Sequence, residues 1–402
     1  MKATEILYQD LRSYYPQIHS SRLKTLCTFV ESGIKDQRVS VTYLGRGLES
    51  GSVTTKKHDI KRADRLIGNA HLHCERHDYY EYMTEQLIGR EKYPIILIDW
   101  SPINGQEIYQ LLRASIPMQG RGLVLYEKTF HESELNTEKA HQSFLDELEQ
   151  VLPEGCQPVI TTDAIYRSPW FKAVELKGWY WIGRVRGQVS LSQDKETWYT
   201  SYQWFKAAKV NKAEHLGVLY YGKVAKFKCE GVLFKRNKKG RSAKKKRGGV
   251  SQRTTDKTHE KDANEAWLLV FNLPPRYKNN ANIAVSLYRQ RMQIEENFRD
   301  TKNGKLGISL EYANSKSVER FDNLLLIAGL ILFIIWCVGR AAVMKKIHYS
   351  LQANSLKYRA VLSTIYIGRE VAKDGRYTIT IDEYVYVLAH LSELAVSMED
   401  LL

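Results

Sequence analysis

Two apolar runs that each end in an aspartate mark the middle of this chain. Residues 93–100 read YPIILIDW and residues 158–163 read PVITTD, and both have the β-branched and aliphatic content of buried strands. Further strands are predicted at 111–116, 122–126 and 179–186, and helices at 135–151 and 169–176. Because strands alternate with helices, the pattern predicts an α/β core.

The pattern differs on both sides of this core. Residues 1–90 are polar with short amphipathic stretches, which predicts helices. Residues 188–280 are strand-like and irregular, whereas about 282–302 and 320–340 are predicted as helices. The second helix contains the run LLLIAGLILFIIWCV at 324–338, whose 15 residues fall short of the roughly 20 needed to span a bilayer. We therefore expect a buried helix packed against a sheet.

Composition adds one departure from an ordinary globular protein. The 402 residues carry a formal net charge of +15, which favours a polyanionic partner such as nucleic acid. Nine Lys and Arg and no acid lie within 235–247, so the rest of the chain carries about +6. We expect a mobile basic loop at about 235–262 that contacts phosphate. The five cysteines show no paired spacing, which indicates reduced thiols in a cytosolic protein.

A second basic feature lies nearer the N-terminus. Residues 39–48 and 54–69 resemble two helices around a turn, with Thr54 or Thr55 as the cap of the second. The cations that this second helix would show are Lys56, Lys57, Lys61, Arg62 and Arg65. Two interpretations stay open: a helix-turn-helix that places a basic helix in a DNA groove, and a solvated surface helix.

Asp99 and Asp163 end the two apolar runs. At the carboxyl ends of strands in an α/β sheet, side chains open into the crevice where ligands bind. Two acids brought together there repel each other unless a divalent cation lies between them. Carboxylate ligands without Cys or His suit Mg²⁺ or Mn²⁺. The alternative is that both aspartates are turn formers or helix caps.

A third acid comes from the predicted helix at 288–302, YRQRMQIEENFRDTK. The polar residues that share one face of this helix are Tyr288, Arg291, Glu295 and Lys302. They project within roughly 60° of one another, whereas Glu296 points about 100° away from Glu295. A carboxylate for a metal ion, with cations and a phenol for phosphate oxygens, fits this face. The alternative is a solvated face with an Arg291–Glu295 ion pair.

The segment HLHCERH at 71–77 offers a competing zinc site. His73 and His77 are four residues apart, with His71 and Cys74 beside them. No second ligand pair appears at a suitable distance along the chain, so we do not expect zinc.

The helix at 288–302 carries the signature Y-x2-R-x3-E-x6-K, and here the chain resembles the bacterial DDE transposases of the insertion sequence four family. The strands that end in Asp99 and Asp163 are also similar to theirs. So are the segments KRADRLIGNAHLHCER, GRGLVLYEKTF and GWYWIGRVRG, in the same order. The resemblance covers about 5–380 and is weakest over 188–262 and at the C-terminal end.

This resemblance implies a fold and an order of domains. The expected fold is α/β, with an RNase H-like catalytic domain at 91–187 and 281–345 that is split by a β-rich insertion at 188–280. A helical DNA end-binding domain would occupy 1–90. A helical region at 346–402 would follow as a candidate dimerisation region.

The resemblance also implies a chemistry. Asp99, Asp163 and Glu295 would hold two Mg²⁺ (or Mn²⁺) ions per site for cut-and-paste transposition. In that reaction the transposon ends are cleaved through a hairpin and then joined to target DNA. It likewise implies that the residues near the cleaved end fall into two groups. The phosphate contacts would be Tyr288, Arg291 and Lys302, and the base-flipping positions Trp267 and Met292. Many relatives carry Trp at the latter position, so stacking there would be weaker in this chain.

The expected partners are double-stranded DNA, both as transposon ends and as target, and a second copy of the chain in a synaptic homodimer. The expected location is the bacterial cytoplasm at the nucleoid, with no membrane. Two other classes stay open. One is an RNase H-like endonuclease or resolvase without strand transfer, and the other is a regulator that only binds the ends.

Overall fold

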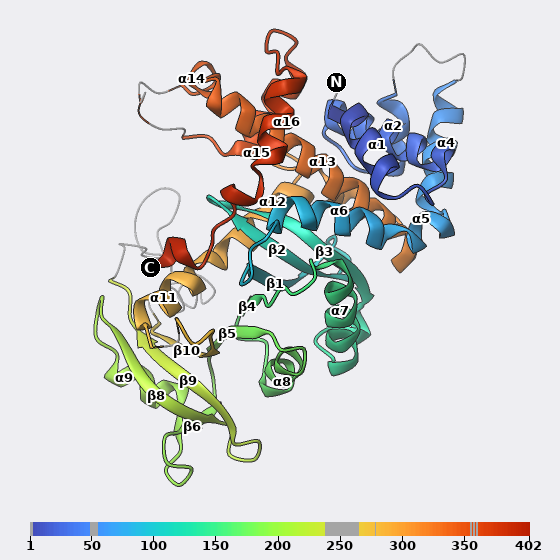
Figure 1. Ribbon diagram of the computed structural model, residues 1–402. Coiled ribbons are helices and arrows are strands. Elements are labelled where there is room, and N and C mark those ends of the chain that lie inside the picture. The colour runs from blue at the N-terminus through green and yellow to red at the C-terminus, as the bar shows by residue number, and fades with distance from the viewer. Residues whose placement is uncertain are drawn as a thin grey trace, which may run out of the picture. The chain divides into compact units, whose positions relative to one another are not determined.

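The computed structural model describes residues 3–48, 55–237, 265–277, 279–353, 356, 358 and 361–402. The chain forms two compact units (Figure 1). The first unit holds Met1–Cys156 with Met292–Ser397, and the second holds Gln157–Arg291 with Met398–Leu402. The basic loop predicted at 235–262 lies outside the described residues from 238 onward.

Helices fill the N-terminal part of the first unit. Their bounds are α1 Ala3–Tyr14, α2 Ser20–Asp36, α3 Val41–Arg46, α4 Lys56–Ile67, α5 Ala70–Cys74 and α6 Arg76–Ile88. α5 begins at a polar cap, because Asn69 Oδ1 accepts a hydrogen bond from Leu72 N at 3.0 Å. α3 and α4 pack against each other. The helices predicted for residues 1–90 are therefore confirmed.

An antiparallel meander follows in the first unit. Its strands are β1 Ile95–Pro102, β2 Tyr109–Met118 and β3 Arg121–His131. Gln119 and Gly120 turn the chain between β2 and β3 with φ of 43° and 99°, the left-handed region that glycine favours. The register places Arg113 opposite both Asp99 and Glu127. The 3-10 turn Glu132–Glu134 and the helix α7 Glu138–Val151 come next, so the predicted strands and helix are present here with longer strands.

The second half of the first unit is helical again. Its elements are α12 Met292–Lys302, the 3-10 turn Leu310–Tyr312, α13 Val318–Met344, α14 His348–Leu351, α15 Thr364–Lys373, α16 Ile381–Ala389 and the 3-10 turn Ser392–Leu394. α12 and α13 pack on the meander, and α13 also packs against α2 and α15 (Figure 1).

α13 has 27 residues and extends slightly beyond the predicted helix at 320–340 at both ends. By length and composition it could cross a membrane, but 94% of its most apolar window is buried inside the protein. It is apolar on all sides because neighbouring elements cover it on all sides. The prediction of a buried core helix is confirmed.

The second unit contains the remaining strands. Their bounds are β4 Val159–Thr162, β5 Tyr180–Val185, β6 Ser190–Ser192, β7 Tyr199–Thr200, β8 Ala213–Tyr221, β9 Phe227–Phe234 and β10 Trp267–Asn272. Its helical elements are α8 Ser168–Leu176, α9 Ser201–Ala207, α11 Ala281–Gln290 and the 3-10 turn Glu399–Leu401. β4 is parallel to β5, whereas β10 is antiparallel to both β5 and β9. The order in the sheet is β4-β5-β10-β9-β8-β6-β7.

The prediction of one continuous helix at 282–302 is wrong, because the helix is interrupted at one residue. α11 ends at Gln290, Arg291 forms a turn, and α12 begins at Met292. Arg291 N bonds to Tyr288 O at 3.2 Å, three residues back, so the hydrogen-bond ladder tightens there although the backbone of Arg291 stays right-handed. The two units also divide at this point.

Candidate active site

Asp99 occupies the carboxyl half of β1, after four residues that are completely buried. The side chain of Asp99 is half-buried, and its Oδ1 accepts a hydrogen bond from Trp100 N at 2.9 Å. The strand thus places a carboxylate where the apolar run meets a polar region, as the sequence pattern predicts.

The neighbouring Trp100 is held by a histidine that the sequence analysis did not single out. Trp100 Nε1 donates to Nε2 of His141 on α7 at 3.2 Å. His141 is buried, and burial lowers its pKa to about 4, so at neutral pH Nε2 is an unprotonated acceptor. No signal marks His141 in the sequence beyond its place in a predicted helix.

α12 separates its two adjacent glutamates. Glu296 pairs with Arg121 on β3, with Arg121 Nη1 at 2.5 Å from Glu296 Oε2, and also with Arg299. Glu295 is exposed and lies about 100° around the helix from Glu296. The two adjacent glutamates thus have different surroundings.

Lys302 at the end of α12 reaches the end of β1. Its Nζ donates to Ser101 Oγ and to Pro102 O, the latter at 3.0 Å. Burial, together with the positive charge of Arg113, lowers the pKa of Lys302 to about 8, while Asp99 opposes the shift. The first unit therefore brings Lys302 close to Asp99.

The second unit gathers other predicted residues. Asp163 follows β4, is half-buried, and accepts a hydrogen bond from Ile165 N at 2.8 Å. Tyr288 on α11 is 5% exposed, and its ring packs edge-on against Trp267 with ring centroids 5.0 Å apart. The guanidinium of Arg291 lies 6.0 Å from the centre of the Tyr288 ring. Burial raises the pKa of Tyr288, the nearby Arg291 lowers it, and Asp163 adds to the rise.

The predicted acids are divided between the two units. Asp99 and Glu295 belong to the first unit, whereas Asp163 belongs to the second. The phosphate-binding set is divided as well, since Tyr288 and Arg291 lie on the other side of this boundary from Lys302. Of the two base-flipping candidates, Trp267 is half-buried in the second unit, and Met292 in the first is 53% exposed.

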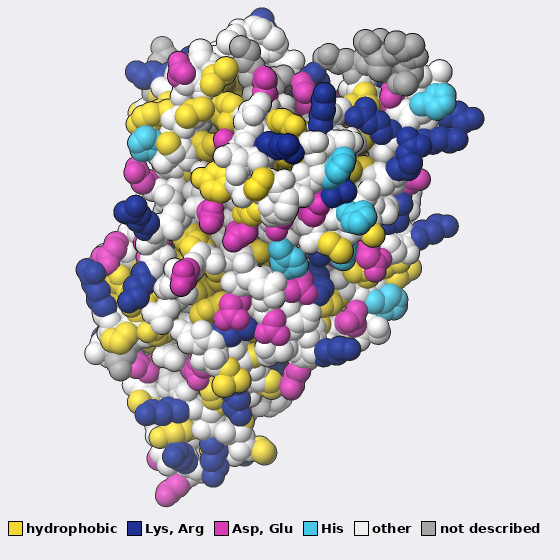
Figure 2. Space-filling view, turned by 45° about the vertical axis from the view of Figure 1, so that its right-hand side comes forward, with side chains coloured by type: hydrophobic (Ala, Val, Ile, Leu, Met, Phe, Trp, Pro, Cys, Tyr) yellow, Lys and Arg dark blue, Asp and Glu magenta, His cyan; other side chains and the backbone are white. Residues whose placement is uncertain are grey.

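The basic face predicted for α4 is present on the surface. Figure 2 shows Lys and Arg side chains gathering where α4 lies. The exposed residues of this face are Lys56, Lys57, Lys61, Arg62 and Arg65. Lys56 Nζ donates to Arg46 O at 3.0 Å, which ties α4 to the end of α3. Thr55 occupies the cap position but bonds the ring of His58 at 2.8 Å instead of a backbone N–H.

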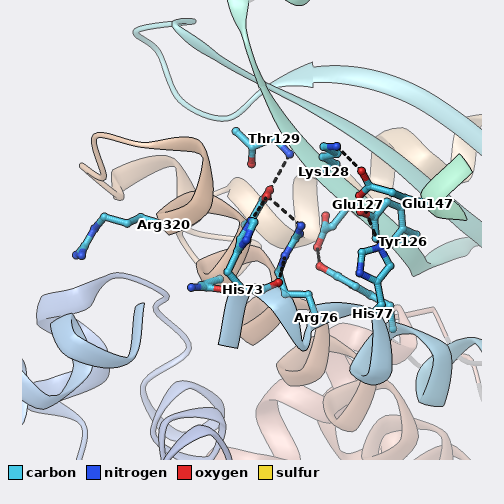
Figure 3. A network of polar contacts seen from close by, with 12 residues as sticks. His73, Arg76, His77, Tyr126, Glu127, Lys128, Thr129, Glu147 and Arg320 are labelled. Carbon is cyan, nitrogen blue, oxygen red and sulfur yellow. Dashed lines mark hydrogen bonds and ion pairs between the residues drawn. The ribbon is translucent and has the colours of Figure 1, made fainter. Parts of the chain in front are cut away.

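The histidines of the 71–77 segment face carboxylates (Figure 3). His73 Nε2 lies 3.2 Å from Asp322 Oδ2, and His77 Nε2 lies 3.6 Å from Glu147 Oε2. In the part of the chain that the structure describes, no group of three or more His, Cys, Asp or Glu side chains is arranged to hold a metal ion.

Comparisons with known proteins place these residues in a family. A family model described as the transposase DDE domain matches residues 90–332, a span that includes Asp99, Asp163 and Glu295. A search of curated proteins gave no match. Because the family model covers more than half of the 402 residues, this chain belongs to the DDE transposases.

Proposed function

We propose that this protein is a cut-and-paste transposase that cleaves DNA at transposon ends, forms a hairpin there, and joins the freed ends to target DNA. The match to the transposase DDE domain over residues 90–332 carries this proposal. The contact of Lys302 with the end of β1, beside Asp99, supports it, because it gathers a carboxylate and a phosphate-binding cation at one place.

Asp99, Asp163 and Glu295 are proposed to hold two Mg²⁺ or Mn²⁺ ions. A set of carboxylates without nitrogen or sulfur donors fits such hard cations. When bound, the ions supply Lewis-acid stabilisation of phosphoryl oxygens and lower the pKa of an attacking water. Asp99 and Asp163 are both half-buried rather than enclosed in the core.

Cations and aromatic residues of the chain are proposed to hold the DNA. The phosphate contacts near the cleaved end are Tyr288, Arg291 and Lys302. The exposed face of α4 would contact the duplex farther away through Lys56, Lys57, Lys61, Arg62 and Arg65. Trp267 and Met292 would support a flipped base, and the exposed side chain of Met292 suits that role better than core packing does.

The finer classification is also part of the proposal. The meander β1–β3 followed by α7, and the parallel pair β4–β5, support an RNase H-like catalytic domain at 91–187 and 281–345. The insertion at 188–280, the end-binding domain at 1–90 and the dimerisation region at 346–402 complete the proposed domain order. The signature on residues 288–302 supports membership of the insertion sequence four family, near the transposase of the tetracycline-resistance transposon ten, as a further part of the proposal. It would act as a homodimer on paired ends in the bacterial cytoplasm.

A cleavage assay tests the proposal. Labelled duplexes that carry the DNA flanking the coding sequence are incubated with purified protein and Mg²⁺, with Ca²⁺ or with EDTA. The variants are Asp99→Ala, Asp163→Ala and Glu295→Ala, with Glu296→Gln as the matched control. We expect end binding by every variant, and cleavage in Mg²⁺ by the wild type and Glu296→Gln alone.

Several outcomes separate this proposal from its rivals. Cleavage without joining to a target plasmid would identify a nuclease or resolvase, and binding without cleavage by the wild type would identify a regulator. Cleavage that survives Glu295→Ala and not Glu296→Gln would overturn the assignment of Glu295. Strand transfer in EDTA would overturn the metal-dependent mechanism altogether.

A further inference from the structure

A row of charged residues crosses the meander beneath α12. Asp99 on β1, Arg113 on β2 and Glu127 on β3 are direct cross-strand neighbours, so their side chains project from the same face. Arg113 and Glu127 are both completely buried. The first of the proposed metal-binding acids therefore stands at the end of a buried ionic row.

The guanidinium of Arg113 joins three elements. Its Nε donates to Glu127 Oε2 at 2.7 Å, and its Nη2 lies 2.5 Å from the same oxygen. Its Nη1 donates to α12, at 2.8 Å to Asn297 Oδ1 and at 2.9 Å to Thr301 Oγ1. Because these donors lie in one plane at fixed angles, they fix the orientation of α12 relative to β2 and β3.

A second polar anchor holds the beginning of the same helix. Gln293 Oε1 accepts hydrogen bonds from Met118 N and Gly120 N in the β2–β3 turn, both at 3.1 Å. Glu295 lies between this anchor and Asn297, and Lys302 directly follows Thr301. The two functional residues of α12 are thus set by anchors within two residues of each.

The stability of the fold does not by itself require a buried arginine at position 113. Apolar residues of similar size in place of a buried ion pair often leave stability unchanged or increase it. Apolar side chains cannot fix the rotation of a helix about its own axis with directional bonds, however. With a carboxylate about 6 Å from the helix axis, a rotation of roughly 10° moves it by about 1 Å.

We propose that Arg113 is a positioning residue, which sets the rotation of α12 and thereby the place of Glu295 and Lys302 relative to Asp99. The inference rests on the proposed function. A displacement of about 1 Å at a reacting centre lowers a rate by roughly 100-fold, so the anchor matters for cleavage far more than for folding.

The test compares a variant that keeps the fold with one that keeps the charge. Arg113→Met combined with Glu127→Leu removes both buried charges together, so neither is left unpaired. Arg113→Lys keeps the charge but replaces the fork of donors by a single ammonium. For both variants we expect single-turnover cleavage to fall by roughly 100-fold while end binding changes by less than about 3-fold. The amides of α12 should exchange with deuterium about 10-fold faster, without a matching change in α7.

Tyr80→Phe is the matched control. Tyr80 on α6 donates to Glu127 Oε1 at 3.4 Å, whereas Arg113 donates to the other oxygen, Oε2. Figure 3 shows Glu127 in this polar network next to α6. The control removes a buried hydrogen bond from the same carboxylate, and we expect it to cleave at the wild-type rate.

Wild-type cleavage by the double variant or by Arg113→Lys overturns the inference. An equal loss of cleavage in Tyr80→Phe also overturns it, because general weakening of the core would then explain all three results. If the α12 amides of the double variant exchange with deuterium at the wild-type rate, the inference is also overturned. A wild-type protein that cleaves no DNA defeats the proposed function instead, and hydrogen exchange still measures whether Arg113 holds α12.

Discussion

The crossing of α13 and α15 gives the sharpest stability prediction, at Gly368. A Cβ atom at Gly368 would lie 1.9 Å from Ile335 O and 3.0 Å from Gly339 N. Both are backbone atoms, which cannot turn aside as the end of a side chain can. Gly368→Ala therefore forces α15 away from α13 by more than 1 Å if the new methyl group is to reach ordinary contact distance.

The size of the effect follows from two opposed contributions. Alanine in a helix is favoured over glycine by about 1 kcal/mol. Overpacking against rigid neighbours costs about 3 kcal/mol, because α15 packs closely on α13 and its Ile365, Ile367 and Val371 are buried. The separation also strains the bond from Arg369 Nε to Gln37 Oε1, which is 2.7 Å long. We expect a net loss of about 2 kcal/mol.

Thermal unfolding of the full chain is the assay. For a unit of this size, a loss of about 2 kcal/mol corresponds to a melting transition lower by roughly 4–8 °C. Gly375→Ala is the matched control, since a Cβ there meets nothing within 4 Å. If Gly368→Ala and Gly375→Ala melt at the same temperature, α15 does not approach α13 as closely as described and the reasoning fails.

Three further predictions concern the buried histidine and the DNA contacts. Burial lowers the pKa of His141 to about 4, so the folded chain binds a proton there less readily than the unfolded chain does. The contribution of neutral His141 to stability is complete above pH 6.5, and its loss as the pH falls toward 4 lowers the free energy of unfolding by about 3 kcal/mol. Urea unfolding at pH 7 and at pH 4 should therefore show a smaller loss of stability in His141→Gln than in the wild type. Lys57→Gln and Lys61→Gln should each reduce the slope of log affinity against log salt concentration by about 1 in titrations with duplex DNA. An unchanged slope would show that α4 does not contact the DNA. Lys302→Met should slow cleavage by at least about 10-fold at saturating DNA, and an unaltered rate would show that its contact with β1 is only structural.

Local patterns were sufficient for part of this structure. The aliphatic runs before Asp99 and Asp163 predicted the strands that place these acids, because a buried strand depends on its own residues more than on distant ones. The exposed cations of α4 followed from helical spacing in the same way. Glu296 forms ion pairs with Arg121 and Arg299, whereas the choice of Glu295 as the metal-binding acid stays a prediction.

Other features depend on contacts that a single sequence does not display. The pattern of α11 and α12 is continuous, so nothing local marks the turn at Arg291. Nothing local marks Arg113 and Glu127 either, because it is their pairing across β2 and β3 that allows both to be buried.

The place of α13 in the chain has a consequence during synthesis. The elements it packs against in the N-terminal helices and in β3 are made earlier, because α13 begins only at Val318. Until the ribosome has released this helix, those surfaces have no cover and stay open to chaperones and to aggregation. A nascent chain stopped before residue 318 should therefore bind chaperones persistently. Completion of α13 then commits the first unit to its final packing in one late step.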